Sequence, residues 1–150
     1  MQKESSNMLK LSLANYDFNA ELREYVGRVI ERYEPSAIIL FGSLTRGDYW
    51  HDSDADIIVI LTEKRVNHLT KGLELRELGY KMPLDLFVYG TEQFENMIAS
   101  GNLLALDAME YGKPIYIGSE DYWNRLAPLW QKTRNEWQPT EYGWRSKQSA

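Results

Sequence analysis

The sequence has 150 residues, a formal charge of −5, two histidines and no cysteine. Such a length suits one domain with a substantial core, and the missing cysteines exclude disulfides and thiolate metal sites. The acidic charge argues against extended nucleic-acid binding. The polar N-terminus argues against a signal peptide and the short apolar runs against a membrane span, so we expect a cytoplasmic protein.

The chain is expected to start with a flexible arm and a helix. Residues 1–16 show no sustained hydrophobic period, which indicates the arm. From Phe18 to Tyr33 apolar residues recur every three or four positions, and this spacing predicts an amphipathic helix. Asn19 is a suitable N-cap, and Pro35 ends the helical pattern.

Beyond this helix, strands and helices follow one another. Short apolar runs predict strands at residues 37–41, 54–61, 84–89 and 115–117. Helices are predicted at residues 66–80, at 91–98 with Thr91 as the cap, and at 103–111, which Gly112 ends. In the first of these helices, Leu69 and Leu73 share one register. The predicted fold class is therefore α/β, a mixed β-sheet flanked by helices.

The last part of the chain differs in composition from the rest. Four of the five tryptophans recur every seven residues from Trp123 to Trp144, which keeps them near one face of a helix. Pro128 and Pro139 are expected to interrupt any single helix and to leave a frayed end. We interpret residues 1–118 as the domain and 119–150 as a Trp-rich, helical extension. This extension either packs on its own domain or faces a partner.

Three aspartates form the most informative pattern. Asp54 and Asp56 stand two residues apart at the start of a strand, so both carboxylates project from one face of the pleat. Asp85, at the start of a later strand, can supply a third carboxylate to that face. Like charges in such a cluster repel one another unless a cation lies between them. With no cysteine and two histidines in the chain, carboxylate oxygens are the main candidate metal ligands. The pattern therefore predicts a hard cation, Mg²⁺ or Mn²⁺, and two such ions can bind a triphosphate between them.

A glycine-led turn precedes the aspartates. Gly42 at the end of the first strand permits close approach of the backbone, and the amides and hydroxyl at Ser43 can point at phosphate oxygens. Arg46 is a candidate for neutralising phosphate charge. For these residues simpler explanations stay open: Ser43 is also a suitable helix cap, and Arg46 can pair with Asp48 or Asp52.

Together these residues resemble the minimal nucleotidyltransferase family of the DNA polymerase β superfamily. The family pattern of Gly-Ser, ten residues, Asp-x-Asp and a later Asp is met by Gly42, Ser43, Asp54, Asp56 and Asp85. The resemblance spans about residues 37–89, and the joint pattern is specific. The Trp-rich extension lies outside it.

The resemblance implies a nucleotidyltransferase fold and transfer of AMP from ATP to a hydroxyl group, with release of pyrophosphate. It also implies that Asp54 and Asp56 bind both metal ions, and that Asp85 completes one metal site and takes the proton of the acceptor hydroxyl. Family members of this size resemble antitoxins paired with a HEPN-domain toxin, which implies a partner tyrosine as acceptor and a homo- or hetero-oligomer.

Two alternatives remain open at this point. The domain is also compatible with a non-catalytic binding module that neutralises a partner by contact. The acidic surroundings of the motif also suit a cationic small-molecule acceptor such as an aminoglycoside. Neither the base preference, nor the number of nucleotides transferred, nor the oligomeric state follows from the sequence.

Overall fold

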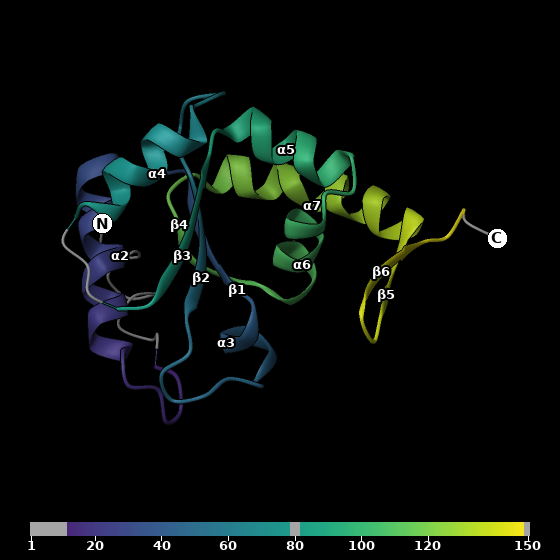
Figure 1. The fold of residues 1–150 in the computed structure, drawn as a ribbon. Helices are drawn as coiled ribbons and strands as arrows, with labels where there is room; N and C mark the ends of the chain where they lie inside the picture. The colour runs from purple at the N-terminus through teal and green to yellow at the C-terminus, as the bar shows by residue number, and fades with distance from the viewer. Residues whose placement is uncertain (1–11, 79–81, 149–150) are drawn as a thin grey trace.

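The computed structural model describes residues 12–78 and 82–148 (Figure 1). Helices and strands follow one another along most of this part of the chain. In order they are α2 (Asn19–Tyr33), β1 (Ala37–Phe41), α3 (Ser43–Arg46), β2 (Ala55–Ile60), α4 (His68–Arg76), β3 (Leu84–Tyr89), α5 (Thr91–Ala99), α6 (Leu103–Tyr111), β4 (Lys113–Ile117), α7 (Glu120–Glu136), β5 (Trp137–Thr140) and β6 (Gly143–Ser146).

The central sheet is mixed, which confirms the predicted fold class. Within the described residues, its strands lie in the order β3-β2-β1-β4. The middle strand β1 runs antiparallel to both β2 and β4, whereas β2 and β3 run parallel. The parallel pair requires a crossover, and helix α4 supplies it on one face of the sheet (Figure 1).

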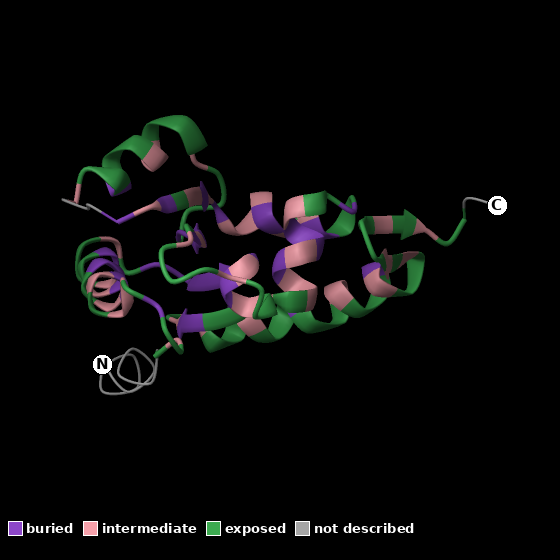
Figure 2. Cartoon of the chain, turned by 60° about the horizontal axis from the view of Figure 1, so that its bottom comes forward, coloured by how far each residue is buried: buried purple, intermediate pink, exposed green. Residues whose placement is uncertain are grey.

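Apolar side chains cover both faces of the sheet because successive strand residues point in opposite directions. One face packs against α2 and α4 through Leu22, Val29 and Leu75. The other face packs against α5, α6 and α7 through Phe94, Ala105 and Leu126. Figure 2 shows buried residues concentrated in the strands and on the inner sides of these helices. The result is a three-layer arrangement with the sheet in the middle.

Several predicted elements agree closely with the structure. The strands at residues 37–41 and 84–89 and the helix at 103–111 have the predicted bounds. The helix predicted from Phe18 begins at Asn19, whose side chain does not cap the helix but bonds the backbone of Leu13.

The apolar register predicted for the helix after residue 66 does not face the core. Leu69 and Leu73 are 69% and 64% exposed, and Leu75 is the fully buried leucine of α4. The helix thus packs on the sheet through a different side from the one that its two spaced leucines indicated. Part of the predicted 66–80 helix, residues 79–80, lies outside the described residues.

The flexible arm predicted for residues 1–16 is wrong at its C-terminal end. Tyr16 is 6% exposed and belongs to the core cluster under α2. Residues 1–11 lie outside the described residues. Hydrophobic periodicity could not predict this packing, because a single buried tyrosine has no periodic partner in a short turn.

The C-terminal extension also differs from the prediction. Helix α7 continues through Pro128 instead of breaking there. Pro128 lies on the exposed side of the helix, while Tyr122, Leu126 and Thr133 are buried on the inner side. The Thr133 hydroxyl donates to the backbone oxygen of Ile98, at 3.0 Å. Tertiary packing on both sides of the proline therefore sustains the helix.

The predicted frayed end after Pro139 is a hairpin, formed by β5 and β6. Its Trp144 indole Nε1 donates to Asp107 Oδ1 on α6 at 2.8 Å. The Trp144 ring packs against the rings of Trp130 and Tyr111, and the guanidinium of Arg134 lies over the Trp144 ring. These contacts show that the extension packs on its own domain. In the part of the chain that the structure describes, no helix combines the length and apolar character needed to cross a membrane.

Candidate active site

The parallel pairing of β2 and β3 brings two of the predicted aspartates together. Asp56 and Asp85 are direct register partners on these neighbouring strands. Register partners in a parallel pair point to the same face of the sheet, and the two carboxyl groups are hydrogen-bonded to one another. The third predicted carboxylate, Asp54, precedes Asp56 by two residues, and its charge acts on Asp56.

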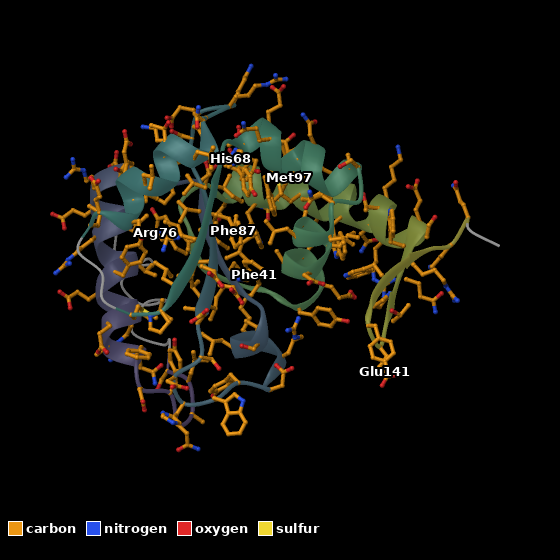
Figure 3. All side chains as sticks on the ribbon, viewed as in Figure 1. Phe41, His68, Arg76, Phe87, Met97 and Glu141 are labelled. Carbon is orange, nitrogen blue, oxygen red and sulfur yellow. The ribbon has the colours of Figure 1, made fainter. Side chains whose placement is uncertain are left out.

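The carboxylates lie at the end of the face covered by α5, α6 and α7. Phe41 and Phe87 lie next to them on the same face and belong to the apolar core there. Their ring centroids are 5.9 Å apart (Figure 3). Asp85 is exposed and Asp56 is half-buried. The cluster therefore sits at the boundary between core and solvent, beside α3, where a solute can reach it.

Gly42 packs its backbone directly against Asp56. Its φ of 76° and ψ of −152° belong to a region that only glycine adopts readily. A Cβ atom at this position would collide with Asp56 Oδ2. Any other residue would thus have to displace the carboxylate, which explains the need for glycine at the end of β1.

The start of α3 presents free backbone donors beside the carboxylates. The first N–H groups of a helix have no acceptor within the helix, and at α3 these belong to Ser43 and Leu44. The Ser43 side chain is half-buried. Arg46 ends the same helix, and its positive charge lowers the pKa of Asp56. Its Nε lies 3.9 Å from Asp48 Oδ1, so Arg46 contacts Asp48 and also acts on the aspartate cluster.

The electrostatics of the cluster favour a bound cation. Burial, the hydrogen bond to Asp85 and the charges of Asp85 and Asp54 raise the pKa of Asp56 to about 6. Without a cation, Asp56 therefore retains its proton at mildly acidic pH. A divalent cation can replace that proton and remove the repulsion.

The carboxylates suit a divalent metal ion that is bound jointly by the protein and by the phosphate groups of a substrate. No group of three or more His, Asp or Glu side chains forms a ready-made metal cage among residues 12–78 and 82–148. Mg²⁺ is commonly bound by one or two carboxylates together with substrate phosphates and water. The paired carboxyl groups of Asp56 and Asp85 match this donor set, and the charge of Asp54 also acts on Asp56.

Tyr16 is the neighbour of the cluster that the sequence did not reveal. Its hydroxyl donates to the backbone oxygen of Ser53 at 2.8 Å. Burial and the charges of Asp54 and Asp56 raise its pKa to about 12. No motif links Tyr16 to the aspartates, so only the fold could show this proximity.

A shallow hollow of about 330 Å³ lies elsewhere on the molecule. It is lined by residues of α4, α5 and the C-terminal end of β3, among them His68, Tyr89 and Met97. Figure 3 shows His68 and Met97 near one end of the sheet and Phe41 toward the other. The hollow is therefore separate from the aspartate cluster, which lies at the N-terminal end of β3.

Comparison with known proteins agrees with this geometry. The family model described as polymerase beta, nucleotidyltransferase matches residues 24–106, which contain all six predicted site residues. A search of curated proteins finds no match.

Two solved structures have similar chain arrangements. One, from Sulfolobus solfataricus and described as a candidate nucleotidyltransferase, is 16% identical with a TM-score of 0.46, over 74% of this chain and 84% of the other. The second, described as a toxin-antitoxin with AMP-PNP, is 17% identical with a TM-score of 0.44, over 75% and 83% of the two chains.

The family model extends over more than half of the chain and includes β1, the glycine turn and the paired strands that carry the aspartates. The chain belongs to the polymerase β nucleotidyltransferase family.

Proposed function

We propose that this protein is a Mg²⁺-dependent nucleotidyltransferase that transfers AMP from ATP to a tyrosine hydroxyl of a HEPN-domain toxin, and so acts as an antitoxin. The observation that carries the catalytic part is the register pairing of Asp56 with Asp85, together with the charge of Asp54, which acts on Asp56. The toxin partner and the tyrosine rest on the resemblance of the motif to antitoxin nucleotidyltransferases.

In this proposal the three carboxylates hold divalent cations and organise the reacting groups. Asp54 and Asp56 would bind both ions, and Asp85 would complete one of the two sites. The bound ions would neutralise phosphate charge and lower the pKa of the attacking hydroxyl. Asp85 is exposed on the outer strand β3, where it can accept the hydroxyl proton. The acceptor oxygen bonds to the α-phosphorus, the bond to the β-phosphate oxygen breaks, and pyrophosphate leaves.

The turn after β1 is suited to bind the triphosphate. Ser43 and Leu44 are the first residues of α3, so their backbone N–H groups have no acceptor within this helix and can donate to phosphate oxygens. Gly42 brings this backbone against the Asp56 carboxylate, so phosphate and cation would meet at one place. Arg46 adds a positive charge that already acts on Asp56. Positioning and charge neutralisation are the main contributions of such a site.

The surface beside the cluster suits a protein acceptor. Trp50 lies on the loop that leads into Asp54, and it is 77% exposed. Large exposed aromatic side chains are enriched where proteins bind one another. We therefore place the contact with a protein acceptor on this loop.

The test uses ATP labelled at the α-phosphate, Mg²⁺ and, as acceptor, a purified HEPN-domain toxin. We expect label on the acceptor, no label with Asp56→Asn, and unchanged transfer with Asp52→Asn. Asp52 is a matched control because it is an exposed carboxylate on the same loop, outside the sheet.

The acceptor residue is then found by substituting single tyrosines of the partner with phenylalanine. Equal labelling by wild type and Asp56→Asn would refute the role of the aspartates. Neutralisation of the partner by Asp56→Asn, without label, would show that the protein acts as a binding module instead. Label on an aminoglycoside, but not on the protein, would show a small-molecule acceptor.

A further inference from the structure

The loop between α3 and β2, which carries Asp54, is bonded to the segment that precedes α2. We call this segment, residues 12–18, the brace. The backbone N–H of Asp17 donates to the carbonyl of His51 at 2.8 Å, and their side chains form an ion pair. The hydroxyl of Tyr49 donates to the carbonyl of Ala14. The brace and the loop are thus joined by backbone, ionic and hydroxyl contacts.

One contact of the brace reaches the peptide bond of Asp54 itself. The Tyr16 hydroxyl donates at 2.8 Å to the carbonyl oxygen of Ser53, which is part of the Ser53–Asp54 peptide unit. A peptide unit is planar, so fixing its oxygen also fixes the direction in which the chain enters Asp54. On the other side, the Ala55 N–H donates to the Pro83 carbonyl at 3.0 Å. Asp54 is therefore anchored at both ends.

The ring of Tyr16 is itself held in place. It is 6% exposed and packs edge-on against Phe18 and Tyr49, with ring centroids 5.8 Å and 6.0 Å away. Asn19 closes the turn of the brace through hydrogen bonds to the carbonyls of Leu13 and Tyr16. This packing and these hydrogen bonds hold the Tyr16 hydroxyl in position to donate to Ser53. A buried ring in a packed turn has few alternative rotamers.

We propose that Tyr16 is a positioning residue, whose hydroxyl orients Asp54 for cation binding through the Ser53–Asp54 peptide unit. This inference rests on the proposed function, because it assigns Asp54 a role in holding the cation. The brace precedes the segment that matches the family model, which begins at residue 24. The pKa of the Tyr16 phenol, raised to about 12, lies far above neutral pH, so the hydroxyl is a hydrogen-bond donor there.

The test compares Tyr16→Phe with Tyr49→Phe. Both changes remove a tyrosine hydroxyl that donates to a backbone carbonyl across the same contact, but only Tyr16 bonds the peptide unit of Asp54. We expect Tyr16→Phe to raise the Mg²⁺ concentration needed for half-maximal transfer by about 10-fold to 100-fold, the usual effect of removing a hydrogen bond that orients a metal ligand. The KM for ATP at saturating Mg²⁺ should change much less. Tyr49→Phe should leave both values unchanged.

A second readout needs neither metal nor turnover. In the metal-free protein, the backbone amide resonance of Asp54 should shift, and its hydrogen exchange should become faster, in Tyr16→Phe and not in Tyr49→Phe. Incorporation of 4-aminophenylalanine at position 16, which keeps an N–H donor in the same place, should restore the wild-type amide signals and Mg²⁺ requirement. This rescue separates lost positioning from a general loss of stability.

The outcomes distinguish this inference from the proposed function. Wild-type transfer that Asp56→Asn abolishes, together with an unchanged Asp54 amide and Mg²⁺ requirement in Tyr16→Phe, would overturn the role of Tyr16 alone. Equal effects of Tyr16→Phe and Tyr49→Phe would overturn it as well, because the effect would then belong to the brace as a whole. Absence of transfer by the wild type would instead count against the proposed function.

Discussion

The backbone of Gly42 lies where a side chain would overlap the carboxylate of Asp56. This contact joins the end of β1 to the start of β2 and keeps the glycine turn beside the aspartate cluster. Glycine is required here for two separate reasons, its backbone conformation and the space that Asp56 takes.

Gly42→Ala tests both reasons. We expect the substitution to abolish nucleotidyl transfer and to lower the free energy of unfolding by about 1–3 kcal/mol from backbone strain, with a further loss from the displaced carboxylate. Gly47→Ala is the matched control, because Gly47 also has a positive φ, of 86°, but has open space around its Cβ position. Urea denaturation and the labelling assay measure the two effects. Equal loss of transfer in both variants would contradict the contact with Asp56.

The carboxylate pair predicts an unusual dependence of stability on pH. The pKa of Asp56 is raised to about 6 in the folded protein, whereas an unfolded aspartate titrates near about 3.9. Between these values the folded state binds more protons than the unfolded state, so folding stability falls as pH rises from about 4 to about 6.

Asp56→Asn cannot titrate and should lack this contribution. In the presence of EDTA, the free energy of unfolding of the wild type should fall relative to that of Asp56→Asn across this pH range. Above it, Asp56→Asn should be the more stable protein. Urea denaturation of both proteins at a series of pH values checks the difference. A difference that stays constant, or that changes in the opposite direction, would contradict the raised pKa of Asp56.

The packing side of α4 can be tested with two leucines two residues apart. Leu75 is fully buried, so Leu75→Ala should lower the free energy of unfolding by about 2–5 kcal/mol. Leu73 is 64% exposed, so Leu73→Ala should change it by less than about 0.5 kcal/mol. Chemical denaturation measures both values. The reverse ranking would indicate that α4 packs through the side that its leucine spacing first suggested.

The β5–β6 hairpin should depend on Trp144. Trp144→Phe keeps an aromatic ring but removes the indole donor to Asp107, a hydrogen bond to a charged group that contributes about 1–3 kcal/mol. We expect faster hydrogen exchange and faster proteolysis within residues 137–146, with little change in the sheet. Tyr142→Phe is the control, because Tyr142 at the hairpin turn is 93% exposed. Unchanged protection in Trp144→Phe would show that the hairpin is held by other contacts.

Periodicity and motif spacing were enough to predict much of the fold. The apolar runs at residues 37–41 and 84–89 are bounded by Pro, Gly and polar residues, and both form strands with the predicted bounds. These predictions succeed because the alternation of side chains across a strand is a local property of the chain.

Long-range packing decided the features that the sequence left open or indicated wrongly. Three such features depend on contacts between residues distant in sequence. They are the register that sets Asp85 opposite Asp56, the side of α4 that faces the core, and the approach of Tyr16 to Ser53. Helix α7 passes through Pro128 because buried side chains on both sides of the proline hold it. Local pattern determines which elements form, whereas the burial of their surfaces against one another determines which residues meet.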